Sequence, residues 1–409
     1  MAWVQKRQPS AVFFELVYDV KMLQELRKRD VKLGRQTINR LHFYGSIFLV
    51  LIIALFIGRV YISLLEPRKD FFNELWAPAY LLVHGQSPYD TSMFNPISPA
   101  AWLPMSIGFF YWLGWLEDTI ALRAWFIASL FQLGFMVFLV QGKHRPLHVS
   151  LISGLFVFSF PPALYHLILG QFSLITTTCL ILALHSVTKQ RHWLTAFLLA
   201  LALSKPQLCT VFIFGLSIYY FKQARWRGLL SFWARVLSMI VVLCLPLFIA
   251  HLNWIPDAVA SMRANPYWLY PSLFIVFKIN LGVLGVWAWA LLALAVLGLG
   301  IILWNNFPLS VAGYWSLALA LFITPYIGSW DFVILLPLWI FTFSKVHWGR
   351  KIFLIISFLL AWYGMNLVQR MESSDNYFFW WVPPWFMTSA ALVTDWKDQI
   401  RLKSGTFPE

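Results

Sequence analysis

An acidic residue, Asp70, follows the first long apolar run of the chain, which covers residues 42–64. It lies in a polar segment, 65–97, that is expected to leave the membrane where the run ends. A carboxylate at such a boundary can accept a proton from a hydroxyl group, and a positioned general base contributes about 10²–10⁴ in rate. The alternative is a solvated acid beside the membrane, so the rest of the chain must supply partners for Asp70.

A basic residue, Lys205, lies in the middle of the apolar region 194–221, within the sequence Ser204-Lys205-Pro206-Gln207. A lysine near the membrane interior costs roughly 2.5–3.5 kcal/mol on insertion scales, which favours a function. Its long side chain could also reach the membrane surface. Because Pro206 cannot continue a helical hydrogen-bond ladder, the region is predicted to form two short helices that meet at a polar corner.

Further polar side chains are expected on the same outer side, and an asymmetric collection of this kind is typical of a functional site. Ordinary explanations compete at several positions. His166 could be a satisfied polar anchor, Arg59 could reach the membrane surface, and Asp331 could cap a helix. The aromatic-rich loop with His251 and Arg263 fits either a phosphate site or an interfacial belt. The outer set comprises Asp70, Glu74, His84, Asp90, His166, Gln171, Lys205, Gln207, His251, Asp257, Arg263, Trp330, Asp331, Glu372 and Asp375, and Arg59 lies near the outer end of the first span.

Membrane helices must position these residues. The chain has 409 residues, of which 60% are hydrophobic and 12% charged, against about a quarter charged in ordinary soluble domains. Many apolar runs are long enough to cross a bilayer core of about 30 Å. The fold class is therefore predicted to be an all-α polytopic membrane protein. Candidate spans lie near 42–64, 98–116, 119–141, 148–166, 171–187, 194–205, 207–221, 229–250, 282–304, 310–325, 331–344, 352–368 and 379–394.

Basic residues set the predicted orientation. The formal net charge is +14, and Lys and Arg cluster in short loops near 189–193, 222–227 and 345–351. This is the positive-inside pattern of membrane proteins, and it argues against nucleic-acid binding. These loops are cytoplasmic together if either 98–116 or 119–141 fails to cross. We expect 98–116 to be the segment that does not fully cross. The chain then has about twelve spans, and both termini lie in the cytoplasm.

The predicted domains follow from this orientation. A basic N-terminal segment, 1–41, forms a cytoplasmic interfacial helix or a solvated tail. The membrane-embedded domain covers 42–394, and a cytoplasmic tail covers 395–409. The three cysteines lie in apolar runs, so no disulfide or metal framework is expected.

The order of several short motifs resembles the GT-C glycosyltransferases, and most closely glycosyltransferase family 87 of the polyprenyl-phosphate-mannose-dependent type. The resemblance runs from about residue 42 to 340. The motifs that carry it are Asp70-Phe71 with Trp76, Leu81-Leu82 with Gly85 and Ser87-Pro88-Tyr89-Asp90, Phe160-Pro161-Pro162 with Gly170-Gln171, Ser204-Lys205-Pro206-Gln207, and Ser329-Trp330-Asp331 before Leu335-Leu336-Pro337.

The resemblance implies a shared helical core with an outward-facing cavity and Asp70 as the catalytic base. Its donor would be a polyprenyl-phosphate sugar, with mannose favoured, and its acceptor a hydroxyl on a glycolipid or glycan at the outer face of the plasma (inner) membrane. Candidate donor-phosphate residues are Lys205, Arg263, His251 and Arg59. Candidate sugar or acceptor residues are Trp76, His84, Tyr89, His166, Gln171, Gln207, Trp330 and Asp331.

The expected reaction inverts the anomeric configuration in one displacement. No cofactor is expected, and a metal-independent reaction is favoured because carboxylates are not densely clustered and Lys and Arg can stabilise a lipid monophosphate. Two alternatives stay open: a transporter or flippase of lipid-linked sugars, and an oligosaccharide polymerase or ligase.

Overall fold

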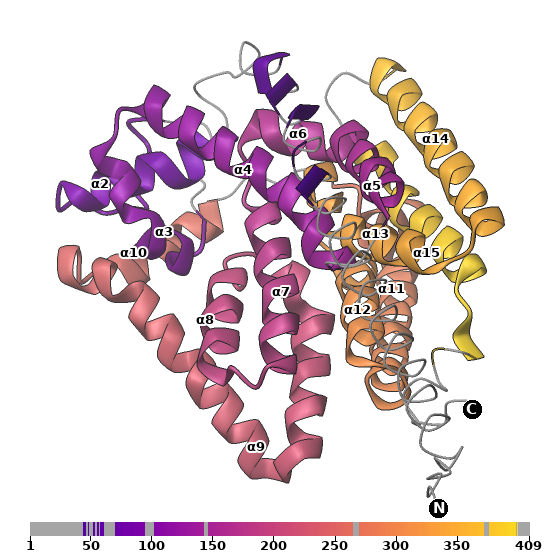
Figure 1. The fold of residues 1–409 in the computed structure, drawn as a ribbon. Coiled ribbons are helices and arrows are strands. Elements are labelled where there is room, and N and C mark those ends of the chain that lie inside the picture. Colours follow the sequence, from indigo (N-terminus) through magenta and orange to yellow (C-terminus); the bar gives the residue numbers. More distant parts are fainter. Residues whose placement is uncertain are drawn as a thin grey trace, which may run out of the picture.

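A computed structural model describes residues 70–94, 102–142, 146–264, 270–371 and 376–397, together with isolated positions at 44–60 and 399. Every regular element in these ranges is helical (Figure 1). The predicted segment 1–41 and most of the predicted tail 395–409 lie outside the described residues. The elements are η2 (Phe72–Trp76), α2 (Ala77–Val83), α3 (Pro104–Phe110), η3 (Tyr111–Trp115), α4 (Asp118–Gln141), α5 (Leu147–Ser159), α6 (Pro161–Leu169), α7 (Ser173–Thr188), α8 (His192–Ala202), α9 (Pro206–Ala250), α10 (Trp254–Ala264), α11 (Leu273–Asn306), α12 (Leu309–Ile323), η4 (Ser329–Leu335), α13 (Leu336–Lys345), α14 (Trp348–Met371), η5 (Asn376–Phe379) and α15 (Val382–Val393).

Membrane-spanning capacity belongs to fewer helices than the sequence predicts. Within the described ranges, four helices are long and apolar enough to cross a membrane: α4, α9, α11 and α14. The pair α5 and α6, bent by 57°, would make a fifth span if the two form one crossing. The helices α7, α8 and α12 are apolar but shorter. The expectation of about twelve spans is therefore not confirmed, although the all-helical class is.

The segment expected not to cross, 98–116, contains two short elements in its described part. The helix α3 has 7 residues and η3 has 5, so neither approaches the roughly 20 residues that a spanning helix needs. The following helix, α4, has 24 residues. These lengths favour a crossing by 119–141 over one by 98–116, and which segment crosses stays a prediction.

Two long helices contain backbone breaks. In α9, which has 45 residues, Ala224 and Arg225 leave the helical conformation, and Arg225 has a φ of 52°. This break separates the predicted spans 207–221 and 229–250, so their division is confirmed. The second break lies at Gly282 in α11.

Apolar side chains on α11 are unusually exposed. Val283, Leu284 and Leu291 are 75%, 74% and 68% accessible to solvent. In the apolar 18-residue stretch of α11, 17% of the residues are buried inside the protein. A helix that is hydrophobic all round and has little protein against it belongs in a lipid environment. The outward face of α11 is therefore suited to contact acyl chains.

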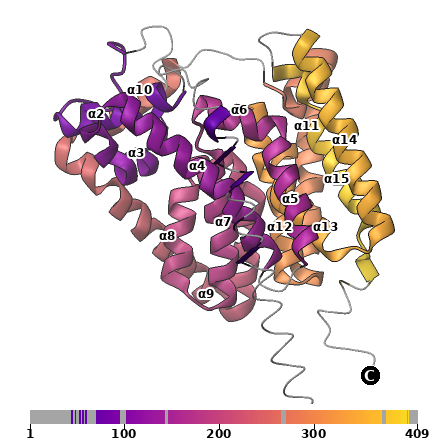
Figure 2. The same ribbon diagram turned by 45° about the horizontal axis from the view of Figure 1, so that its top comes forward.

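Three consecutive elements run back and forth between two ends of the bundle. The helix α7 leads from Ser173 to a turn at Lys189–Arg191, α8 returns to the corner at Lys205, and the first arm of α9 leads away again to the break at Arg225. These helices pack together, and Figures 1 and 2 show the α7–α8 turn and the bend of α9 at the same end. The corner with Lys205 consequently lies at the opposite end from these basic turns.

Candidate active site

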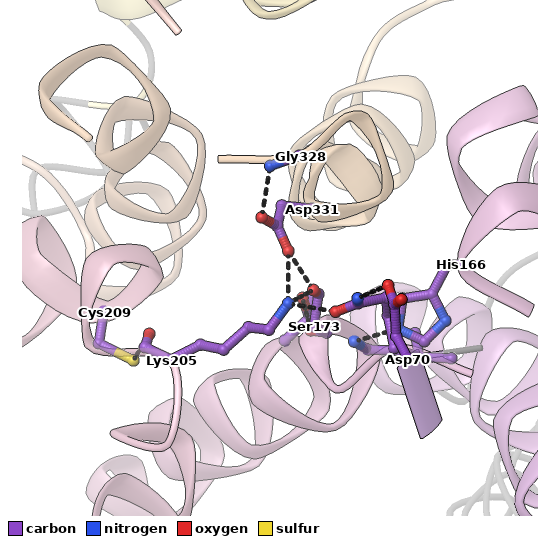
Figure 3. Close-up of polar contacts among 10 residues, drawn as sticks. Asp70, His166, Ser173, Lys205, Cys209, Gly328 and Asp331 are labelled. Atoms are coloured by element: carbon purple, nitrogen blue, oxygen red, sulfur yellow. Dashed lines mark hydrogen bonds and ion pairs between the residues drawn. The ribbon is translucent and has the colours of Figure 1, made fainter. Parts of the chain in front are cut away.

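Five polar residues meet where helices begin or break. Asp70 lies just before η2, Gln171 and Ser173 lie at the junction of α6 and α7, Lys205 lies between α8 and α9, and Asp331 lies in η4. The first and the last of them, Asp70 and Asp331, are more than two hundred residues apart in the chain. Figure 3 shows their side chains joined by hydrogen bonds.

Lys205 is the centre of this cluster and is buried, with 7% exposure. Its Nζ donates to Gln171 Oε1 at 2.6 Å, to Ser173 Oγ at 2.9 Å and to Asp331 Oδ1 at 2.9 Å. An ammonium group has three N–H donors, so these partners match its full capacity. A buried charge is tolerated when it is both paired and hydrogen-bonded, and Lys205 meets both conditions.

Gln171 connects Lys205 to Asp70. Its carbonyl oxygen accepts from Lys205, and its Nε2 donates to Asp70 Oδ2. Gln171 is 2% exposed, so this amide has little access to water. The ionic partner of Lys205 is Asp331, whereas Asp70 is reached through the neutral amide.

Asp331 has two tasks. Its Oδ1 accepts from Lys205 and from the Ser173 hydroxyl, and its Oδ2 accepts from the backbone N–H of Gly328 at 2.9 Å. Its own backbone N–H donates to the Gly328 carbonyl at 3.0 Å. The cap-like role considered for Asp331 is therefore present, and the same carboxylate also neutralises a buried cation.

A close backbone approach explains why Gln171 reaches Asp70. Gly170 ends α6 in the left-handed region with a φ of 70°. A Cβ added at Gly170 would lie 2.5 Å from the Cβ of Phe71, a distance that no side chain tolerates. Glycine thus permits both the conformation and the contact, and it places the next residue beside Asp70.

His166 supports the same junction. Its Nε2 accepts a hydrogen bond from the backbone N–H of Leu174 at 3.0 Å, in the first turn of α7. The ring is 1% exposed. This arrangement fits the polar-anchor interpretation of His166, and its role in sugar binding stays a prediction.

Glu74 belongs to the same neighbourhood; it was in the predicted outer set, but no catalytic or binding role was predicted for it. It lies four positions after Asp70, in the π-helical turn η2, and π-turns often occur at functional sites. Burial raises the pKa of Glu74 well above its usual value, the nearby Asp70 raises it further, and Lys205 opposes the rise. Its spacing from Asp70 was the available signal, because residues four apart share a helix face.

Two tyrosines, Tyr270 before α11 and Tyr326 after α12, lie next to each other. The rings of Tyr270 and Tyr326 lie 4.1 Å apart between centroids. Burial is the main cause that raises the pKa of Tyr270, and the neighbouring Tyr326, Glu74 and Asp331 add to it. These phenols therefore remain protonated hydrogen-bond donors close to the carboxylates.

His251 lies in a separate cluster. Its Nε2 is 2.8 Å from Asp257 Oδ2, and the Ser87 hydroxyl donates to the same oxygen. The hydrogen bond from Ser87 and the contact with His251 lower the pKa of Asp257. These contacts tie the segment after α2 to α10. Arg263 is exposed on α10, and Arg59 is exposed in a groove against α4 that Phe126 also lines.

The remaining candidate residues have varied surroundings. Trp76 is buried, and its Nε1 donates to the Leu116 carbonyl at 3.0 Å. His84 is exposed, with Nδ1 2.7 Å from the Tyr80 carbonyl oxygen. Tyr89 is buried, whereas Gln207 and Trp330 are partly exposed. The structure brings none of these into the hydrogen-bonded cluster of Lys205, and their roles stay predictions.

Metal ligands are the last feature of the site. Among the residues that the structure describes, no three His, Cys, Asp or Glu side chains are grouped so as to hold a metal ion. The arrangement instead offers a carboxylate, a buried cation and protonated phenols. Such a set can accept a proton and orient a polar substrate.

A helical membrane protein with a buried polar cluster at helix breaks is the class that these observations define. The family model of glycosyltransferase family 87 matches residues 103–325. The match covers more than half of the chain, so the chain belongs to glycosyltransferase family 87. It includes Gln171, Ser173 and Lys205, while Asp70 and Asp331 lie outside its limits. No curated protein and no solved structure matches the chain.

Proposed function

We propose that this family 87 protein transfers a sugar from a polyprenyl-phosphate donor to a hydroxyl acceptor, with Asp70 as the general base. Membership of the family supports glycosyl transfer. The observation that carries the assignment of Asp70 is the chain of hydrogen bonds from the buried Lys205 through Gln171 to its carboxylate. A carboxylate tied to such a network is held in a defined orientation, as a positioned base requires.

The reaction proceeds in one displacement. Asp70 accepts the proton of the acceptor hydroxyl while that oxygen attacks the anomeric carbon of the sugar. The bond between the anomeric carbon and the phosphate oxygen breaks, and the electron pair leaves with the polyprenyl phosphate. Attack from the face opposite the leaving group inverts the configuration at the anomeric carbon.

The leaving phosphate gains negative charge, so cations near it lower the barrier. Arg263, His251 and Arg59 are proposed for this role. Arg59 is suited to a lipid-linked donor because it lies beside apolar side chains of α4. In this proposal side chains supply all the charges, and no metal ion or other cofactor is required.

The proposed donor carries mannose, and the proposed acceptor is a glycolipid or glycan at the outer face of the plasma membrane. A lipid donor enters sideways from the bilayer, which explains the need for a membrane-embedded enzyme. The end of the bundle with Lys205 would face outward and the end with the basic turns would face the cytoplasm, in accord with the positive-inside rule.

The experiment compares Asp70→Asn with wild type. Purified protein in lipid nanodiscs receives polyprenyl-phosphate mannose and a membrane glycolipid extract, and mass spectrometry follows product formation. We expect the variant to lose about 10²–10⁴ in rate while it keeps normal expression and donor affinity. Glu117→Gln is the matched control, because the exposed Glu117 carboxylate accepts from the Thr119 hydroxyl outside the Lys205 cluster.

Two outcomes would contradict the proposal. An Asp70→Asn variant with the wild-type rate would remove the base assignment. Donor that crosses a bilayer without product formation would instead identify a transporter of lipid-linked sugars. Parallel reactions with glucose and arabinose donors test the choice of mannose.

A further inference from the structure

The charge of Lys205 is already committed to protein groups. Its three donors are matched by Gln171, Ser173 and Asp331 at hydrogen-bond distances of 2.6–2.9 Å. A direct contact with a donor phosphate would require one of these bonds to break inside a buried site. The geometry indicates instead that Lys205 orients the side-chain amide of Gln171.

We infer that Lys205 and Gln171 are positioning residues for Asp70, in which the ammonium fixes the Gln171 amide so that its N–H group always faces the carboxylate. This inference rests on the proposed function, because it takes Asp70 as the base. It replaces a phosphate-binding role for Lys205 with a role in orienting the group that accepts the proton (Figure 3).

The asymmetry of an amide explains the choice of glutamine. A glutamine side chain has a carbonyl oxygen on one side and an NH₂ group on the other. With the observed orientation, the oxygen meets the ammonium of Lys205 and the N–H meets Asp70 Oδ2. The flipped amide would place N–H against the ammonium and oxygen against the carboxylate, and both contacts would be repulsive. Lys205 and the ionised Asp70 therefore favour the same orientation, and Lys205 maintains it when Asp70 is protonated.

The ion pair of Lys205 with Asp331 completes this arrangement. Because Asp331 neutralises the ammonium at 2.9 Å, Asp70 is held by a neutral hydrogen-bond donor and not by a direct ion pair through Lys205. A hydrogen bond donated to a carboxylate stabilises its ionised form, which is the form that accepts a proton. The two carboxylates thus have different tasks, one structural and one chemical.

A labelling experiment without substrate tests whether Lys205 and Gln171 act on Asp70. The probe is dicyclohexylcarbodiimide, which reacts with protonated carboxyl groups, and peptide mass spectrometry measures the pH midpoint of Asp70 modification. The variants are Gln171→Leu, which removes the amide, and the double variant Lys205→Met/Asp331→Asn. The double variant removes both members of the buried pair, so it leaves neither charge unpaired and keeps the net charge unchanged.

Among the residues that the structure describes, the titratable and charged groups near Asp70 include Glu74 on its own helix, Lys205, Asp331, and the phenols Tyr270 and Tyr326 close to Glu74. Gln171→Leu removes the hydrogen bond to the carboxylate, so it is expected to move the Asp70 midpoint upward by about one pH unit. The double variant keeps the amide but removes the ammonium that orients it, so its midpoint is expected to shift in the same direction. Gln141→Leu is the matched control, since Gln141 is a buried amide bonded to Ser153 in another part of the bundle. Its midpoint should equal that of wild type, and unchanged midpoints in both test variants would overturn the inference.

Transfer kinetics separate orientation from donor binding. With polyprenyl-phosphate mannose as the probe, both variants should lose roughly 10–100-fold in kcat with little change in KM for the donor. A higher KM with unchanged kcat in the double variant would assign Lys205 to direct phosphate contact and overturn the inference. If wild-type protein makes no product, the proposed function fails, while the labelling midpoints still decide whether Lys205 and Gln171 act on Asp70.

Discussion

At the scale of single residues, Glu74 is the group that should make the free energy of unfolding depend most clearly on pH. Its raised pKa means that, between its ordinary value of 4.5 and the raised value, the folded protein binds more protons at Glu74 than the unfolded chain does. The free energy of unfolding therefore falls as the pH rises through this window. The reason is that ionisation of Glu74 in the fold opposes both burial and the charge of Asp70.

Glu74→Gln should remove this loss. We expect the variant to keep more of its thermal stability than wild type as the pH rises above 4.5, by a few °C for each ~1 kcal/mol retained. Thermal unfolding in detergent across this range measures the effect. Asp90→Asn serves as the control for an exposed carboxylate in the same segment. Parallel pH profiles of Glu74→Gln and wild type would refute the burial-based explanation.

The sequence revealed single site residues better than their pairing. Lys205 could be singled out because a charge among apolar residues is costly and conspicuous. Asp70 could be singled out by its place just after the first apolar run, and Asp331 by its place at the start of a predicted span. Their partners are long-range, since Lys205 and Asp331 are 126 positions apart, and no local pattern encodes that contact. Ser173 carried no signal, because a serine in the first turn of a helix is common for local reasons alone.

At the scale of elements, the helix breaks place the site residues. The corner at Lys205 was predictable from Pro206, which is confirmed as the first residue of α9. The number of spans was not, because apolar runs of similar hydropathy become long helices, bent pairs or short buried helices according to their tertiary neighbours. The helix α7, for example, is apolar but has 16 residues and is almost wholly buried.

Gly170 is the element boundary with the most specific requirement. Gly170→Ala should destabilise the protein by roughly 1–3 kcal/mol, because a left-handed conformation and a clash with Phe71 coincide there. The shift of Gln171 away from Asp70 should also lower transfer. Thermal unfolding and product formation measure the two effects separately.

The control for Gly170→Ala is Gly298→Ala in α11, where an added Cβ meets nothing within 4 Å. Alanine replaces glycine within a helix there, so stability should stay equal or rise by about 0.5–1 kcal/mol. Equal behaviour of the two variants would show that the approach of Gly170 to Phe71 has no special role.

At the scale of the whole molecule, the first arm of α9 separates the end with the Lys205 cluster from the end with the basic turns. From Pro206 to the break at Ala224, the first arm of α9 is about 27 Å long at 1.5 Å per residue. This length is close to the hydrocarbon thickness of about 30 Å. Lys205 and Arg225 therefore lie near opposite faces of a bilayer if this arm crosses it.

This separation predicts the labelling of two exposed glutamines, Gln86 in the segment after α2 and Gln223 beside the break in α9. Gln86→Cys should react with a membrane-impermeant maleimide in right-side-out vesicles, whereas Gln223→Cys should react after permeabilisation. The native cysteines Cys179, Cys209 and Cys244 are buried, so their background is expected to be low.

The opposite labelling pattern would put the Lys205 cluster on the cytoplasmic side, where the positive-inside rule places the basic turns instead. Reaction of both cysteines without permeabilisation would show that the first arm of α9 does not cross the membrane. Either result would remove the outward-facing site from the proposed function but leave the hydrogen-bond chain to Asp70 intact. The orientation of the molecule and the chemistry of its site are therefore tested by independent measurements.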